Sequence, residues 1–168
     1  SNVMAYEEAN YEVVSSNEIY EIRKYSNRLA VETITINQNN SFRKLFKYIS
    51  GSNKTNEKIK MTTPVTQIER EGKMTMQFYL PSKYNKEEVP NPSKSDVKIV
   101  NIEGGYYAVI RYSGRASDKN FFKHKDILEK ELLKNNVLVL SQPIKATYNG
   151  PFTLPMFRRN EAMFKVKF

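Results

Sequence analysis

The residues best suited to chemistry in this sequence form an apolar stripe with cations beside it. The stripe recurs at the spacing of one helix face and consists of Phe42, Leu45, Phe46 and Ile49. Arg43 and Lys47 fall on the neighbouring face. A flat apolar wall beside long cations suits an amphipathic anion, because the apolar area supplies affinity and the cations pair with the acidic end. The same stripe would also serve simply to pack a helix onto a sheet, so both interpretations stand.

The segment 148–159 is a second candidate, because it is unusually apolar for a connection that contains Gly and Pro. Its large apolar side chains are Phe152, Leu154, Met156 and Phe157. Such a loop either folds onto the core as a structural flap or closes over a ligand. The cluster Arg-Arg-Asn-Glu follows at 158–161. It predicts either a buried Arg–Glu network that ties the loop to the last strand or an anion-binding arginine pair.

Cysteine is absent and His124 is the only histidine. These counts exclude disulfides, thiolate nucleophiles, Fe–S clusters and zinc ribbons, and they leave a protein-only metal site short of ligands. His124 lies beside the apolar stripe of a second predicted helix, where an ordinary boundary residue is a simpler interpretation than an axial ligand of iron. The sequence also has no P-loop, Gly-x-Gly-x-x-Gly or Gly-x-Ser-x-Gly motif. We therefore expect a binding protein and not an enzyme.

The chain carries 27 Lys and Arg residues against 18 Asp and Glu residues, a net charge of +9. That balance favours an anionic partner, although it also serves solubility alone. The basic residues never form a long run, which favours a small anionic molecule over nucleic acid. No window is long and apolar enough to predict a membrane-spanning segment. The absence of cysteine is compatible with a cytoplasmic protein and equally with one exported after removal of an upstream signal.

Hydrophobic periodicity predicts helices over 41–50 and 117–133. Alternating and β-branched runs predict strands at 11–14, 19–25, 29–36, 58–61, 64–69, 74–80, 97–102, 106–112, 143–148 and 161–168. The polar turn 26–28 predicts that the runs on either side of it form a hairpin. The proline-rich segment 81–94 predicts an irregular crossover between two halves of the chain.

The two halves resemble each other. Residues 29–34 align with 107–112 at an offset of 78, and residues 59–62 align with 144–147 at an offset of 85. We expect a duplicated β-β-α-β-β unit, in which about eight mostly antiparallel strands form one distorted barrel flanked by two helices. Neither half could bury its own face alone. A single α+β domain over 11–168 is therefore predicted, preceded by residues 1–10 as an extension that is either native or left from cloning.

Five ordered segments of the chain are similar to the SOUL haem-binding protein family. They are 25–32, 46–51, 58–65 (K-I-x-M-T-x-P-V in the family), 78–84 (F-x-x-P-x-x-Y) and 158–161 (R-R-N-E). The resemblance runs in order along nearly the whole chain. It implies a distorted β-barrel built from two similar halves, with two helices outside, in agreement with the repeat.

The resemblance also implies reversible, non-covalent binding of haem or a related tetrapyrrole, for buffering or transport, in a groove along the first helix. Carried over by position, the implied contacts are Phe42, Arg43, Leu45, Phe46, Lys47, Ile49, Phe152, Leu154, Met156 and Phe157. Lys47 matches a basic residue that meets a propionate. Two alternatives stay open, another amphipathic small molecule on the same fold and, with less support, an anionic polymer.

Overall fold

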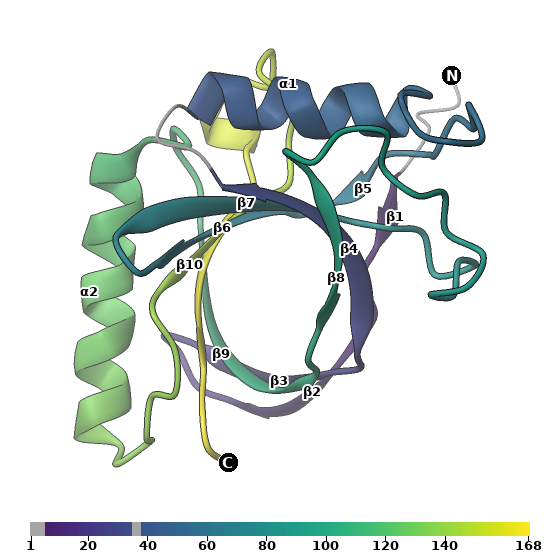
Figure 1. Ribbon diagram of the computed structural model, residues 1–168. Coiled ribbons are helices and arrows are strands. Elements are labelled where there is room, and N and C mark those ends of the chain that lie inside the picture. The colour runs from purple at the N-terminus through teal and green to yellow at the C-terminus, as the bar shows by residue number, and fades with distance from the viewer. Residues whose placement is uncertain (1–5, 35–37) are drawn as a thin grey trace.

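A large antiparallel sheet that curls around its own inner face dominates the structure, a computed structural model that describes residues 6–34 and 38–168. Two helices, α1 (Gln38–Ile49) and α2 (Asp118–Lys134), pack on the outside of the curl (Figure 1). The predicted α+β class and the two flanking helices are therefore confirmed. No helix in the described ranges is long and apolar enough to cross a membrane.

The curled sheet has nine strands within the described residues, where the sequence predicted about eight. Their spatial order is β2-β3-β9-β11-β10-β6-β7-β4-β8, and each neighbouring pair is antiparallel. The strands are β2 (Tyr11–Ser16), β3 (Glu21–Tyr25), β4 (Arg28–Ile34), β6 (Val65–Arg70), β7 (Lys73–Tyr79), β8 (Lys98–Ile102), β9 (Gly105–Tyr112), β10 (Ile144–Thr147) and β11 (Asn160–Lys165). A separate parallel pair joins β1 (Glu7–Glu8) to β5 (Thr62–Thr63).

The strand order is symmetric about the central pair β6 and β10, which confirms the duplication. On one side of this pair lie β11, β9 and β3, and on the other lie β7, β4 and β8. The registers agree with the offset of 78 between the halves. Ala30 pairs with Val100, and their equivalents at this offset, Ala108 and Ile22, pair with each other in the same way. The first strand of each half therefore completes the sheet of the other half.

That exchange of first strands makes the predicted hairpin around 26–28 wrong. β3 pairs with β2 and β9, whereas β4 pairs with β7 and β8, so the two strands lie far apart in the sheet. A polar turn shows where a chain bends, but it does not show which neighbour each strand will find.

The second alignment of the halves needs a correction of register. Val65 pairs with Phe78 as Ile144 pairs with Met163, so Val65 and Ile144 are the equivalent residues. Ile59, aligned with Ile144 from the sequence, is a buried residue beneath α1 and lies outside the strands. Most of the length difference between the halves therefore comes from the loop 148–159 and not from α2.

Both helices bury one face against the sheet. In α1 the buried apolar residues are Leu45, Tyr48 and Ile49, which pack on β4 and β7. The chain leaves α1 at Gly51, which has a φ of 118° that glycine adopts without the penalty of a Cβ. The second helix is capped by Ser117, whose side chain accepts a hydrogen bond from the Asn120 amide.

The core consists of three apolar clusters, two on the outer face of the sheet and one on its inner face. One lies between α1 and the sheet and another between α2 and the sheet, where Phe121, Leu128 and Leu132 are buried. The third lies on the inner face of the curl and includes Tyr25 and Met163. Because successive side chains of a strand alternate between faces, β11 serves the α2 cluster and the inner cluster at once.

Candidate ligand-binding groove

An apolar groove of about 660 Å³ runs between α1 and the start of the loop 148–159. Its floor is the centre of the sheet, the region where the two halves meet. The described residues that line it are Tyr6, Phe42, Phe46, Met61, Thr63, Val65, Gln67, Met76, Ala116, Lys145, Thr147, Tyr148, Asn149, Gly150 and Pro151. We call this cavity the α1 groove.

Phe42 and Phe46 form the aromatic wall of the α1 groove. Their ring centroids are 6.1 Å apart and the ring planes differ by only 13°. The rings are 43% and 51% exposed, so about half of each is open to a ligand. Leu45 and Ile49, also predicted to contact the ligand, are buried in the core beneath the helix and do not line the groove. Leu45 and Ile49 of the apolar stripe therefore pack in the core, whereas Phe42 and Phe46 form a surface of the groove.

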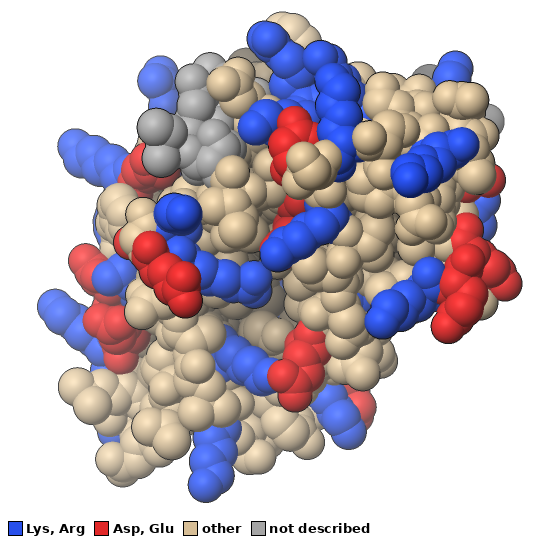
Figure 2. Space-filling model, in the orientation of Figure 1, with Lys and Arg blue, Asp and Glu red and all other residues tan. Residues whose placement is uncertain are grey.

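Arg43 and Lys47 lie in a different hollow, on the other side of α1. This polar depression has a volume of about 280 Å³ and is lined by Asn40, Arg43, Lys44, Lys47, Tyr48, Ser52, Lys94, Asp96 and Val97. Figure 2 shows Lys and Arg side chains gathered over α1 on the viewed face. The structure therefore separates these two cations from the aromatic wall that the sequence placed beside them.

Among the described residues that line the α1 groove, Lys145 is the only charged one. Its side chain is largely buried, and its ammonium donates to the Ala116 carbonyl at 3.0 Å and to Asp118 Oδ1 at 3.4 Å. An ammonium has three donors. These two partners, within the part of the chain that the structure describes, leave one N–H of Lys145 for a further polar group.

The loop 148–159 contributes its first residues to the groove, whereas its large apolar side chains lie outside the groove lining. Phe152, Leu154, Met156 and Phe157 are all strongly exposed, and Phe152 is 98% exposed. Arg158 holds the loop from within, since its guanidinium donates to the carbonyl oxygens of Asn149 and Gly150 at 3.1 and 2.9 Å.

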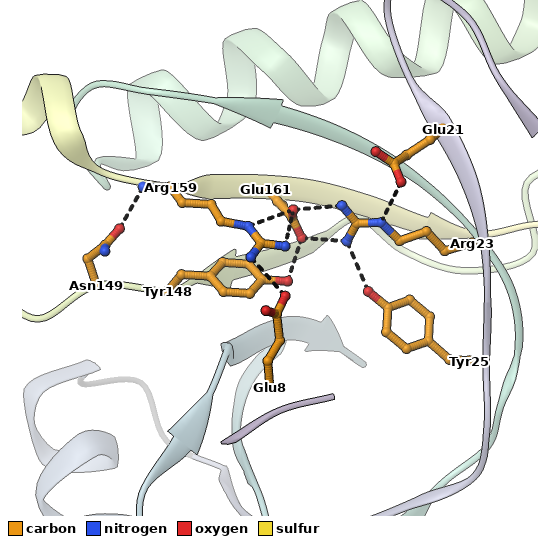
Figure 3. A network of polar contacts seen from close by, with 8 residues as sticks. All are labelled: Glu8, Glu21, Arg23, Tyr25, Tyr148, Asn149, Arg159 and Glu161. Carbon is orange, nitrogen blue, oxygen red and sulfur yellow. Dashed lines mark hydrogen bonds and ion pairs between the residues drawn. The ribbon is translucent and has the colours of Figure 1, made fainter. Parts of the chain in front are cut away.

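A buried ionic network anchors the far end of this loop (Figure 3). Glu161 of β11 accepts two hydrogen bonds of 2.8 Å from Arg23 of β3, 138 residues earlier in the chain. The hydroxyl of Tyr148, which lines the groove, donates to the same carboxylate at 2.6 Å. The position of Tyr148 therefore depends on an ion pair on the inner side of the sheet.

Arg159 extends the network to the N-terminal segment. Its guanidinium donates to Glu161 Oε2 at 3.1 Å, lies over the Tyr148 ring and forms an ion pair of 2.8 Å with Glu8. Arg158 and Arg159 thus serve opposite sides of the loop, and the predicted Arg–Glu network is confirmed. Burial alone would raise the pKa of Glu161, but the hydrogen bonds and charge of Arg23 outweigh it and hold that pKa below its ordinary value.

His124 lies away from the groove, on α2. Its ring stacks on that of Tyr112 with a centroid separation of 4.0 Å, and Nδ1 is 2.8 Å from the Asn120 carbonyl oxygen. This placement agrees with the boundary residue expected from the sequence. In the described ranges no group of three or more His, Cys, Asp and Glu side chains could hold a metal ion.

Another cavity of about 650 Å³ opens beside β1 and differs in character. Glu7, Glu8, Arg28 and Lys86 line it, so it carries charges of both signs. Such a cavity suits a polar ligand, whereas the α1 groove suits a flat apolar one.

Sequence reasoning missed most of the groove floor. Val65, Gln67 and Met76 lie on the hairpin of β6 and β7, and Lys145 lies on β10, which reaches this hairpin only in the folded sheet. Met61 and Val65 belong to the segment 58–65 that resembles the SOUL family, which was a usable signal. Thr62, in the same segment, is buried and its hydroxyl donates to the Tyr79 carbonyl, consistent with a structural role.

Comparisons with known proteins agree with this architecture. The C-terminal domain of EcmrR superposes with a TM-score of 0.66 at 13% identity, covering 94% of this chain and 98% of that one. A hydrolase from Listeria innocua gives 0.64 at 11% identity, covering 92% and 94%. SAV2435 bound to tetraphenylphosphonium gives 0.51 at 11% identity, covering 88% and 93%. At these identities the likeness concerns the fold alone. No curated protein sequence matches the chain.

The chain is an α+β protein whose curled sheet consists of two similar halves, with an apolar groove where they meet. The profile of the SOUL heme-binding protein family matches residues 6–165, nearly the whole chain. The protein therefore belongs to the SOUL family, as its sequence motifs indicated.

Proposed function

We propose that the protein binds haem or a related tetrapyrrole reversibly in the α1 groove. The observation that carries this proposal is the aromatic wall: Phe42 and Phe46 present two nearly parallel, half-exposed rings to an apolar cavity. A flat macrocycle gains most from such a wall because it removes a large apolar area from water on both partners. Membership of a heme-binding family supports the same choice.

The groove fits the macrocycle better than it fits a coordinated iron. Its described lining offers the macrocycle aromatic and aliphatic side chains, and it offers the iron no histidine, because the chain's only histidine is engaged with Tyr112 on α2. Capture therefore rests on apolar contact, and we assign no catalytic step to the groove.

We assign the carboxylate of the ligand to Lys145. This lysine is the charged residue of the described lining and retains an N–H, whereas Arg43 and Lys47 open into the polar depression. The absence of an acidic side chain from the described lining favours an anionic or neutral ligand over a cation such as tetraphenylphosphonium. The nucleic-acid alternative gains no support from the face in Figure 2, where acidic side chains are interspersed among the basic ones.

Replacing Phe46 by serine should weaken haem binding by roughly 1–2 kcal/mol, about 5- to 30-fold, because the ligand loses half of its aromatic wall. The measurement is a Soret titration of the purified protein, in which the wild type should saturate at one equivalent. Phe122→Ser is the matched control, since Phe122 is a 53% exposed phenylalanine on the other helix and does not line the groove. Equal losses of haem affinity in the two variants would show that haem does not bind against Phe46 in the α1 groove.

The carboxylate contact has its own test. Lys145→Met should weaken binding of protoporphyrin IX about tenfold, through loss of one charge-assisted hydrogen bond. It should leave the affinity for the dimethyl ester of the porphyrin nearly unchanged, because the ester has no charge to pair. Lys47→Met is the control. If Lys47→Met, and not Lys145→Met, weakened binding of the free acid but not of the ester, the propionate contact would lie at Lys47, as the family resemblance implies. Tetraphenylphosphonium binding tighter than the porphyrin would overturn the proposed ligand class.

A further inference from the structure

The four large apolar side chains of the loop 148–159 form a surface patch that the proposed function does not use. Phe152, Leu154, Met156 and Phe157 are 98%, 57%, 71% and 70% exposed. Single exposed apolar residues are ordinary on protein surfaces, but four within six positions of one loop are unusual and point to an interaction site. We call these four residues the apolar tip.

Part of the backbone around the apolar tip is hydrogen-bonded within the protein. Thr153 donates to the Gly150 carbonyl, Phe157 to the Leu154 carbonyl, and Gly114 to the Pro155 carbonyl. Arg158 binds the carbonyl groups at the base of the loop from the inner side. These bonds hold the shape of the loop. Side chains that enter only the headgroup region leave the remaining backbone groups of the loop in contact with water.

The charges beside the apolar tip are positive. A shallow depression at its base is lined by Arg115 and Arg158 together with Phe152 and Leu154, and no acidic residue is among its described lining. The whole chain adds a net charge of +9. Apolar side chains flanked by cations are the combination that binds the interface of an anionic bilayer, because burial of apolar area and attraction to the lipid headgroups act together.

We propose that the apolar tip docks on an anionic lipid surface by inserting its side chains among the headgroups. Gly150 and Pro151 join the tip to the lining of the α1 groove. In Figure 1 this yellow segment lies beside α1, so the docked loop brings the groove entrance next to the bilayer. An amphipathic ligand that partitions into lipid would then reach the groove without crossing open water.

The chain contains no tryptophan, which allows a single reporter to be placed in the tip. The Phe152→Trp protein is mixed with vesicles of phosphatidylcholine alone or of phosphatidylcholine with phosphatidylglycerol, with no tetrapyrrole present. We expect its fluorescence maximum to move to shorter wavelength with the mixed vesicles, and less so at high salt. Leu133→Trp is the control, because Leu133 is 79% exposed near the end of α2 remote from the tip. No shift at position 152, or equal shifts at both positions, would overturn the proposal.

Co-sedimentation with the mixed vesicles gives a second readout. The double substitution Phe152→Ser and Met156→Ser should lower the bound-to-free ratio about tenfold or more, and Arg115→Glu should lower it on anionic vesicles, while Leu133→Ser should not. Two results would contradict lipid docking: unchanged sedimentation of the double variant, or a vesicle-free dimer that the double variant dissociates, which would make a second copy the occupant. Because the assay contains no tetrapyrrole, its failure leaves the proposed function untouched.

Discussion

Replacing Arg23 by methionine should lower the free energy of unfolding by about 3–5 kcal/mol, because it leaves the Glu161 carboxylate buried without its main partner. Both side chains of the pair are almost fully buried, at 1% and 0% exposure. Tyr148 and Arg159 still reach Glu161 and keep the loss within this range. The measurement is urea unfolding followed by circular dichroism.

An ion pair with an exposed lysine provides the control for this prediction. Lys98 lies 3.7 Å from Glu32 and its side chain is 63% exposed, while Glu32 also has Arg70 at 3.5 Å and the Gln77 amide at 3.0 Å. Lys98→Met should therefore cost less than about 1 kcal/mol. If Arg23→Met unfolded at the same urea concentration as Lys98→Met, the buried pair would contribute no net stability.

Acid unfolding checks the same pair independently. The pKa of Glu161 in the folded protein lies below its ordinary value of 4.5, so its contribution to stability is present above that pH. The contribution is lost as the pH falls through the depressed pKa of the folded state. Arg23→Met removes the largest lowering influence, and the midpoint of acid unfolding should therefore move to higher pH.

Gly104→Ala should be at least as damaging, with a loss of more than about 4 kcal/mol or failure to yield folded protein. A Cβ at this position would collide with the carbonyl oxygen of Tyr25 and would lie 2.7 Å from the Ser26 carbonyl carbon. Both obstacles are backbone atoms, which cannot rotate away as a side chain can. The Gly104 amide also donates to the Asn27 side chain at 2.7 Å, which fixes the two bends against each other.

Gly150→Ala is the matched control for Gly104, because a Cβ at Gly150 meets nothing within 4 Å. Thermal unfolding of the two variants should differ widely, with the Gly150 variant close to the wild type. A Gly104 variant of wild-type stability would show that the bend at 25–27 and the one at 103–104 can separate without cost.

The sequence predicts those parts of the structure that depend on interactions between residues a few positions apart. Both helices and nearly all strands were predictable, since periodicity and turn residues act over a few positions. The pairing of β3 with β9 was not, because residues 26–27 specify a bend and the partner is decided about 80 residues further on by the whole sheet. Only the internal repeat in the sequence indicated how strands so far apart along the chain correspond to each other.

The residues of the candidate groove were likewise predictable only in part. The stripe on α1 was predictable, but the rotation of the helix on the sheet decides that Leu45 is buried and Phe46 is half exposed. That rotation depends on how side chains such as Phe78 pack beneath it. Lys145 was not predictable as a groove residue, because its neighbours Gln67 and Met76 belong to strands of the other half.

The exchanged first strands bear on how such a chain could arise. Within a single β-β-α-β-β half the first strand pairs with none of the other three strands, since β3 joins β9 and β8 joins β4. An isolated half could complete its sheet only by trading this strand with a second copy. A homodimer of such halves that exchanged their first strands would have the same strand order, with the α1 groove on its two-fold axis. Fusion of the two copies would let the sides of that groove differ, as its aromatic side and its lysine side now do.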